Sequence, residues 1–437
     1  MLKKTAIRVE NPAGTGPEKS GKPDRLLSKD YILLMGSAFT TNVLNYTFLT
    51  TLAPFMVLLT GKAVYGGLMT SVYSIMAIVA RPLSGIISDR SGRVRLLVAG
   101  ALICAVSSFG FGMTTVLAML IILRMMMGIG FGMHSTCAGA AVADVLPKSR
   151  LAEGIGYYGL YSMAGQMLAP AFALYIVAEQ RISDYRILYS IIAGICVVGA
   201  ITGSAVSYER KAKKNLESAG TSDMPGDIQT GSDKVLPKTI LGFEYAVFAP
   251  CIVLAFFTFS MTSVLSYVTL FAASKDFGNS GFFFTFSALG VLAARLTTGR
   301  IVDKRGSDVI VIPALMITVI CLLLVPFMPN MILLAALAVP IGLAQAAVIP
   351  TLNTMAFRRC SSERRGTASA AYYSMIDIGI AVGAPILGII VDEAGYITMY
   401  WIGSAVCLLA LGFYAFVASD KRFNARQAAK RLPPVNN

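Results

Sequence analysis

Charged residues are scarce in this chain of 437 residues. Asp, Glu, Lys and Arg together make up 14% of the sequence, whereas an ordinary soluble protein has about 25%. Apolar residues account for 56%, and the mean hydropathy is +0.69. So few charges cannot cover a water-exposed surface, which means that the main solvent is lipid. The same composition excludes a disordered chain, a coiled coil and a disulfide scaffold.

Metal ligands and catalytic motifs are also missing. The chain has one histidine, His134, and seven scattered cysteines without a C-x-x-C pair, so we expect no metal and no cofactor and interpret the cysteines as apolar packing residues. It contains no G-x-x-x-x-G-K-[ST] phosphate loop, no G-x-S-x-G and no H-E-x-x-H. The sequence therefore predicts neither an ATPase nor any other enzyme.

Long apolar segments recur along most of the chain. Each has about twenty residues, enough to cross ~30 Å of hydrocarbon at ~1.5 Å per residue. We expect transmembrane helices at 31–59, 66–87, 96–115, 117–142, 154–178, 187–206, 247–271, 282–301, 309–327, 332–355, 368–391 and 397–417.

A polar stretch divides these twelve helices into two sets of six. The predicted fold is an all-α membrane protein with two pseudo-symmetric six-helix bundles, 31–208 and 241–418, joined by a linker at 209–240. Residues 1–30 and 419–437 form the predicted tails. If the N-terminus is cytoplasmic, 30 of the 37 Lys and Arg residues fall on the cytoplasmic side and four on the other. This bias predicts a multi-pass protein of the cell membrane with both termini in the cytoplasm. It also explains the net charge of +14 without nucleic acid, because the basic residues face an anionic lipid leaflet.

An internal repeat relates the two sets. Arg81, Gly85, Asp89, a basic residue and Gly92 recur 214 residues later in the segment that begins at Arg295. Tyr157, Tyr158 and Pro170 recur 215 residues later as Tyr372, Tyr373 and Pro385. Parallel repeats of six helices indicate two bundles related by an axis along the membrane normal, with a cavity between them.

With its segment Gly85-x-x-x-Asp89-Arg90-x-Gly92-Arg93, the chain resembles the major facilitator superfamily of transporters, whose loop between the second and third helices carries this motif. The resemblance covers about 390 residues and implies alternating access. It also implies that the motif is a conformational latch, with Asp89 meeting the start of the eleventh helix and Gly85 allowing close helix contact. The degenerate second copy adds three residues to the latch, namely Gly299, Asp303 and Lys304.

Three ionisable residues lie deep inside predicted helices, where charge is costly and marks function by default. Asp377 lies about nine residues into the eleventh helix and has Ser162 as its repeat counterpart, so the acid is not part of the shared scaffold. We expect it to carry the coupled proton, with Arg124 of the fourth helix approaching it in one state. The alternative is a static pair between Asp377 and an arginine. His134 is a further candidate for the proton, although a lone buried histidine is more often a packing residue.

Helix breakers suggest the direction of transport. Gly156, Gly165 and Pro170 resemble, imperfectly, the fifth-helix motif of proton-coupled exporters, and Gly383 and Pro385 repeat the bend in the eleventh helix. Polar and aromatic residues at helical positions form the candidate substrate cavity: Asn42, Asn45, Tyr46, Tyr161, Gln166, Ser263, Tyr267, Gln345 and Asn353.

The predicted function is secondary active transport, most simply the proton-coupled efflux of a small amphipathic molecule. We expect a monomer whose partners are its substrate, protons and the lipid bilayer. One alternative is a proton-coupled importer of a metabolite or organic anion, attracted by Arg124. A more remote alternative is a membrane receptor that transports nothing.

Overall fold

The computed structural model describes residues 27–147, 150–209, 239–240, 243–359 and 365–420. Most of the predicted linker and of both predicted tails lies outside these ranges. The described chain is almost entirely helical. A two-residue antiparallel ladder, between β1 (Thr239–Ile240) and β2 (Phe243–Glu244), precedes the second set of helices.

Eleven α-helices are described. They are α1 (Lys29–Thr60), α2 (Val64–Ser91), α3 (Arg93–Met113), α4 (Leu117–Val145), α5 (Leu151–Ile176), α6 (Ile182–Ser204), α8 (Tyr245–Ser274), α9 (Gly281–Arg305), α10 (Asp308–Leu324), α11 (Met331–Arg358) and α12 (Arg365–Phe413). A 3-10 turn, Val325–Phe327, follows α10, and a π turn, Tyr414–Ala418, follows α12. Helix α12 has 49 residues and contains Gly395 at φ 77°, which breaks it where the sequence predicts a boundary between two helices.

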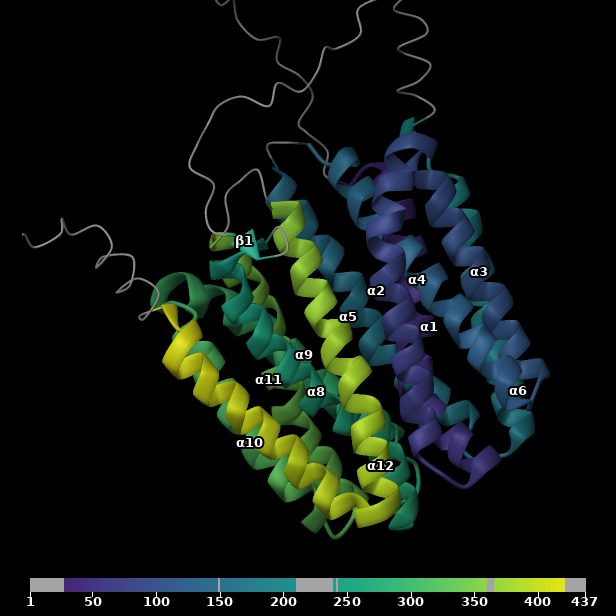
Figure 1. Cartoon of the computed structure of the whole chain (residues 1–437), viewed down its shortest axis with the longest axis vertical. Helices are drawn as coiled ribbons and strands as arrows, with labels where there is room; N and C mark the ends of the chain where they lie inside the picture. Colours follow the sequence, from purple (N-terminus) through teal and green to yellow (C-terminus); the bar gives the residue numbers. More distant parts are fainter. Residues whose placement is uncertain (1–26, 148–149, 210–238, 241–242, 360–364, 421–437) are drawn as a thin grey trace, which may run out of the picture.

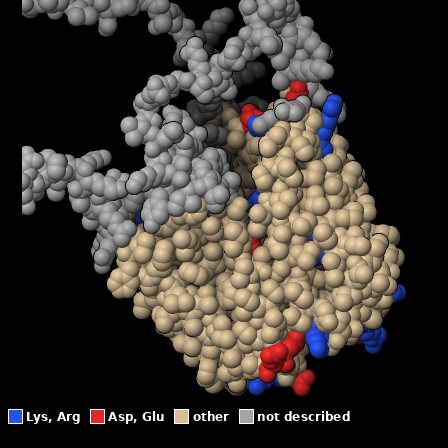
Figure 2. Space-filling view, viewed as in Figure 1, with Lys and Arg blue, Asp and Glu red and all other residues tan. Residues whose placement is uncertain are grey.

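Within the described residues, nine helices are long and apolar enough to cross a membrane. The last of them, Ala371–Ala418, has 48 residues, or about 72 Å at ~1.5 Å per residue, which suffices for two crossings. Charged side chains gather at the two ends of the molecule, and the band between them is almost uncharged on the face that Figure 2 shows. The predicted fold class, an all-α membrane protein, is confirmed.

The helices lie side by side in two groups (Figure 1). We call α1–α6 the first group and α8–α12 the second group. Within the first group α3 packs on α4 and α6, and within the second α8 packs on α12 and α9 on α11. Helix α2 packs extensively on α12, α1 on α8, and α5 on α9, so these three pairs form the junction between the groups.

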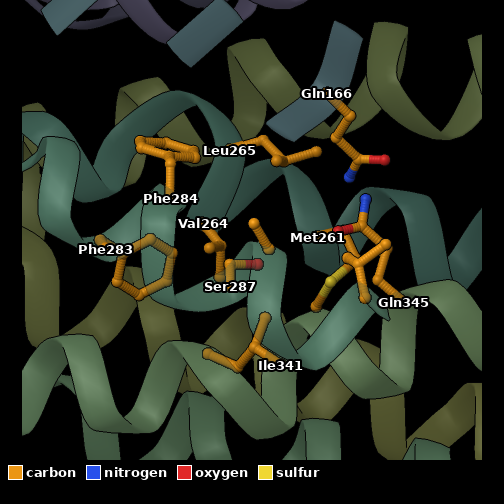
Figure 3. Close-up of a pocket in the computed structure, with 11 residues that line it drawn as sticks. Gln166, Met261, Val264, Leu265, Phe283, Phe284, Ser287, Ile341 and Gln345 are labelled. Carbon is orange, nitrogen blue, oxygen red and sulfur yellow. The ribbon is translucent and has the colours of Figure 1, made fainter. Parts of the chain in front are cut away.

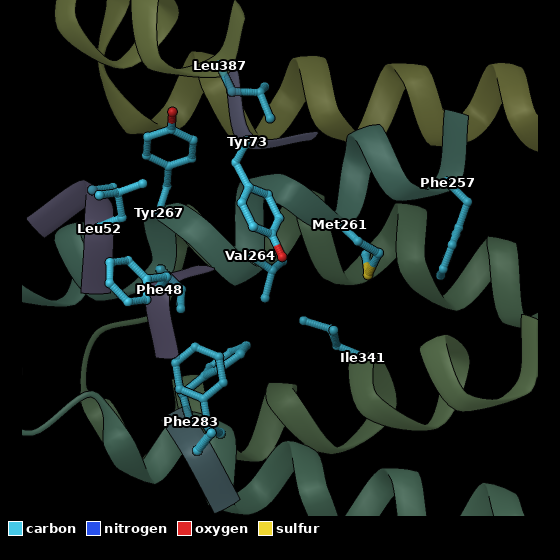
Figure 4. Close-up of a cluster of buried hydrophobic side chains, with 14 of the residues drawn as sticks. Phe48, Leu52, Tyr73, Phe257, Met261, Val264, Tyr267, Phe283, Ile341 and Leu387 are labelled. Atoms are coloured by element: carbon cyan, nitrogen blue, oxygen red, sulfur yellow. The ribbon is translucent and has the colours of Figure 1, made fainter. Parts of the chain in front are cut away.

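The two ends of the molecule are distinguished by the chain ends. We call the end that carries Asp30, Glu209 and Asp420 the terminal face, and the opposite end, with Gly61 and Asp392, the distal face. A continuous apolar core crosses the junction. Phe48 and Tyr73 of the first group belong to the same buried cluster as Met261 and Tyr267 of the second (Figure 4).

Candidate functional site

An ion pair inside the membrane-spanning region joins the two groups. Arg81 of α2 and Asp377 of α12 approach each other to 2.9 Å between Nη2 and Oδ2, and their side chains are 17% and 12% exposed. The Arg81 guanidinium also lies over the ring of Tyr373, 5.6 Å from its centre. Sequence analysis selected Asp377 but missed its partner, because Arg81 belongs to the repeated motif and its repeat counterpart, Arg295, meets no such acid there. Two intramembrane charges of opposite sign on helices that pack in this family's fold were the available signal.

From this ion pair to the distal face, α2 and α12 are held together by contacts to the backbone. Pro385 has no N–H, so the carbonyl of Ala381, four residues earlier, lacks its helical donor. The hydroxyl of Ser71 in α2 donates to that carbonyl at 2.5 Å. A Cβ atom on Gly67 would lie 2.3 Å from the carbonyl oxygen of Ala384. The predicted bend at Pro385 therefore supplies an acceptor for the opposite group, and Gly67 is needed for the close approach.

Asp392 completes this contact at the distal face. Its two carboxylate oxygens accept hydrogen bonds, each 2.8 Å long, from the backbone N–H groups of Ala63 and Val64 at the start of α2. The first N–H groups of a helix have no partner within the helix and carry partial positive charge, so a carboxylate stabilises them. This inter-group cap was not predicted from the sequence.

Arg124 of α4 lies in the core of the first group. It is 1% exposed, and its guanidinium lies 4.2 Å from the ring centre of Tyr73 and 5.1 Å from that of Phe48. Its Nη1 donates to the sulfur of Met127 at 3.0 Å, and its Nε has no acceptor. Asp377, its predicted partner in one state, is paired with Arg81 in this conformation.

His134 is fully buried between α1 and α4. Its Nε2 lies 3.0 Å from the hydroxyl of Ser37 and its Nδ1 lies 3.1 Å from that of Thr41. Because the Ser37 hydroxyl donates to the carbonyl of Gly199 at 2.8 Å, Nε2–H is the donor to Ser37. A neutral ring with Nδ1 accepting from Thr41 then satisfies both nitrogens. This arrangement suits the packing role that the sequence left open for His134.

A narrow cleft opens between the groups, and its walls are mostly apolar (Figure 3). It encloses about 380 Å³ of empty space, its open mouth included, and is lined by α5, α8, α9 and α11. The amides of Gln166 and Gln345, one from each group, point toward each other across it. Both were predicted cavity residues. The rest of the lining is Met261, Val264, Leu265, Phe283, Phe284, Ser287, Ala288, Val291 and Ile341.

Most other predicted cavity residues contact helix backbones or side chains instead. Ser263 donates to the carbonyl of Ser260 at 2.6 Å, and Tyr267 to that of Ala384 at 2.5 Å. Asn42 donates to the carbonyl of Ala38 at 3.0 Å.

Asn45 accepts a hydrogen bond from the hydroxyl of Tyr73 at 2.9 Å. Tyr46 packs against the core, and the buried Oδ1 of Asn353 has no partner. The side chain of Tyr161 lies outside the described part.

The predicted latch is only partly described. Gly92 adopts φ 90° between α2 and α3, and a Cβ there would lie 2.9 Å from Glu209. That carboxylate accepts from the N–H of Arg93 at 2.6 Å, while the Arg93 guanidinium pairs with Asp144. Gly85 has no atom within 4 Å of a Cβ position, so the close helix contact predicted there is absent in this conformation. The surroundings of the other latch and bend residues lie outside the description: Asp89, Arg90, Gly156, Gly299, Asp303 and Lys304.

The bend residues that are described lie against other helices. A Cβ on Gly165 would lie 3.1 Å from Asn42, and one on Gly383 would lie 3.1 Å from Phe259. Pro170 is buried within α5. Among the described residues, no group of three His, Cys, Asp or Glu side chains could hold a metal ion.

Known proteins resemble this chain over most of its length. The staphylopine export protein of Staphylococcus aureus (strain Mu50 / ATCC 700699) is 26% identical over 340 residues, which are 77% of this chain and 83% of that protein. The multidrug resistance protein MdtG of Klebsiella pneumoniae (strain 342) is 24% identical over 348 residues, 79% of this chain and 81% of that protein.

Solved structures share the fold. The nucleoside transporter NupG matches with a TM-score of 0.68 at 12% identity, covering 89% of this chain and 100% of that chain. The human organic anion transporter MFSD10 matches with a TM-score of 0.60 at 16% identity, covering 89% and 99%. A sequence profile described as Major Facilitator Superfamily matches residues 35–330 and 252–435. The chain therefore belongs to the Major Facilitator Superfamily and is a multi-pass membrane transporter, not an enzyme.

Proposed function

We propose that the protein exports a small amphipathic molecule from the cytoplasm in exchange for protons. The names of the two relatives, an export protein and a multidrug resistance protein, support the direction. The 30 Lys and Arg residues on one side support a cell-membrane location with the terminal face in the cytoplasm. An apolar cleft with two facing amides suits an amphipathic cargo. We further propose that a single chain is the working unit.

In this assignment the conformation is closed toward the outside. The contacts of α2 with α12 run from the ion pair of Arg81 and Asp377 to the cap that Asp392 forms at the distal face. Alternating access requires these contacts to separate when the distal face opens. The ion pair is the innermost of them, and it is also the one that a proton can remove.

The observation that carries the proposal is the Arg81–Asp377 pair, because it joins the two moving groups through a titratable acid. Protonation of Asp377 would remove its charge and leave Arg81 without its carboxylate, which weakens distal closure. A cargo group that binds Arg81 or Asp377 would have the same effect. Since either ligand alone breaks the contact, the device suits exchange of the two rather than their joint transport.

The test measures opening of the distal face in the reconstituted full-length protein. Spin labels at Lys62 and Lys275, exposed distal positions in different groups, report the distance between the groups. In the wild type, lowering the pH is expected to lengthen this distance because Asp377 becomes protonated. In Asp377→Asn the long distance should dominate at every pH.

The matched control is Glu393→Gln, which removes an exposed distal carboxylate and should keep the wild-type pH response. Arg81 and Tyr373 are the charged and titratable side chains that contact Asp377 in the described structure. Repeating the measurement with Tyr373→Phe isolates the carboxylate. An unchanged pH response in Asp377→Asn would refute proton coupling through this residue.

An importer of a metabolite or organic anion is the second candidate, favoured by the buried cation Arg124. The two functions differ in the direction of proton-driven accumulation. Inverted membrane vesicles should accumulate the probe Hoechst 33342 under an inward-acid gradient if the protein is an exporter. Accumulation only in right-side-out vesicles would favour import.

A further inference from the structure

Two intramembrane arginines of the first group differ in their surroundings. Arg81 has a carboxylate at 2.9 Å, whereas Arg124, although more deeply buried, has none within ion-pair distance among the described residues. Its described partners are two aromatic rings and the sulfur of Met127, and its Nε has no acceptor. A thioether is a weak acceptor, so most of the five guanidinium N–H donors are unsatisfied by charge.

A buried cation without an anion destabilises the protein that carries it. Cation–π contacts with Tyr73 and Phe48 compensate in part. These rings cover the faces of the guanidinium, and contacts over the faces leave its N–H edge uncovered. That edge is the part of an arginine that binds a carboxylate through two parallel hydrogen bonds.

Tyr73 lies between Arg124 and the cleft. Its ring is the one nearer to the guanidinium, and it belongs to the same buried cluster as Met261 and Val264, toward which its hydroxyl points in Figure 4. Met261 and Val264 also line the cleft. Arg124 is therefore one aromatic side chain away from the space where cargo would bind.

We infer that Arg124 binds a carboxylate of the transported molecule, so that the cargo is an amphipathic carboxylic acid or zwitterion and not a lipophilic cation. Tyr73 separates this subsite from the cleft in the distal-closed conformation. Arg124 lies about seven residues, or ~10 Å, from the distal end of α4. Cargo that moves outward through the cleft would thus meet the cation on the exit side.

This inference rests on the proposed export function, but its test does not require transport. One rival explanation is intramolecular: Asp377 could reach Arg124 in another conformation. In that case no external carboxylate needs the arginine, and Asp377→Asn should reproduce the effects of replacing Arg124.

The binding test uses three fluorescent probes on the purified full-length protein: dansylglycine, which is a carboxylate, dansylglycinamide, which is neutral, and dansylcadaverine, which is a cation. We expect dansylglycine to bind at least tenfold more tightly than the other two. Arg124→Met should reduce its affinity at least tenfold and change that of dansylglycinamide less than threefold. Asp377→Asn should retain dansylglycine binding.

A stability measurement separates a ligand site from a structural arginine. If Arg124 only holds helices together, Arg124→Met lowers the unfolding temperature of the ligand-free protein. If it is an unpaired cation awaiting an anion, the substitution leaves that temperature unchanged or raises it and abolishes the increase caused by dansylglycine. Equal binding of the carboxylate and the amide, absence of carboxylate binding, or a destabilised Arg124→Met that still binds dansylglycine would each overturn the inference. Loss of proton coupling in Asp377→Asn would leave it intact.

Discussion

The two faces of the molecule are held together in opposite ways. At the distal face, polar contacts connect the groups: Asp392 of the second caps the start of α2 in the first. At the terminal face, the charged clusters stay within one group. Glu209 and Asp144 bind Arg93 in the first, and Asp420 binds Arg359 in the second. Ties within a group make it a rigid body, whereas ties between groups must break when the conformation changes.

The comparison also explains where charge is placed along α12. Asp377 and Asp392 are fifteen positions apart on this helix and both contact α2. The first binds a side chain and the second binds backbone N–H groups. We therefore expect the first contact to respond to charge reversal and the second to respond only to loss of the acceptor.

The strongest way to break the comparison is to reverse the inter-group ion pair. Arg81→Asp or Asp377→Arg alone places two like charges in a buried site, so proton-driven transport of Hoechst 33342 should fall at least a hundredfold. The double exchange restores opposite charges and should recover part of the activity. Measured rates with no recovery in the double variant, although it is expressed and folded, would contradict a role based on pairing.

Removing the distal cap should have an intermediate effect. Asp392→Ala leaves two helix N–H groups without an acceptor, a loss of about 0.5–2 kcal/mol for a helix cap. At ~1.4 kcal/mol per tenfold change, the open population should rise by roughly two- to thirtyfold. Spin labels at Lys62 and Lys275 measure it, and Asp392→Asn, which keeps an acceptor oxygen, should shift the equilibrium less. An Asp392→Ala protein that stays closed would show that the cap does not contribute to closure.

A tie within one group should alter stability but not the conformational equilibrium. Asp420 lies 3.0 Å from the buried guanidinium of Arg359, which also donates to the carbonyl of Ala418 at 2.6 Å. Because Asp420 is 31% exposed, Asp420→Asn should lower stability by only about 1 kcal/mol. Thermal unfolding measures this change, and the label distance at the distal face should remain that of the wild type. A longer distance would mean that this cluster also couples the groups.

Much of the fold is accessible from the sequence because a membrane-spanning helix announces itself by length and apolar composition. The expected segment 117–142 is α4 at Leu117–Val145, and the expected break between 391 and 397 falls at Gly395. The site is harder to predict. Gln166 and Gln345 were chosen with seven other residues, and most of the others contact backbone or side chains elsewhere, because a polar residue in a helix satisfies its hydrogen bonds in the same way whether it faces a cavity or a neighbouring helix.

The sequence by itself determined the helices, the repeat of the loop motif, the asymmetric distribution of basic residues and the presence of three deep ionisable side chains. These depend on local composition and spacing. Only the tertiary structure decided that Asp377 pairs with Arg81, that Ser71 takes the carbonyl freed by Pro385, and that Arg124 has aromatic neighbours in place of an acid. Partners on different helices depend on how each helix is rotated and how closely it approaches its neighbour. Those quantities are set by the packing of the whole bundle and by no single segment.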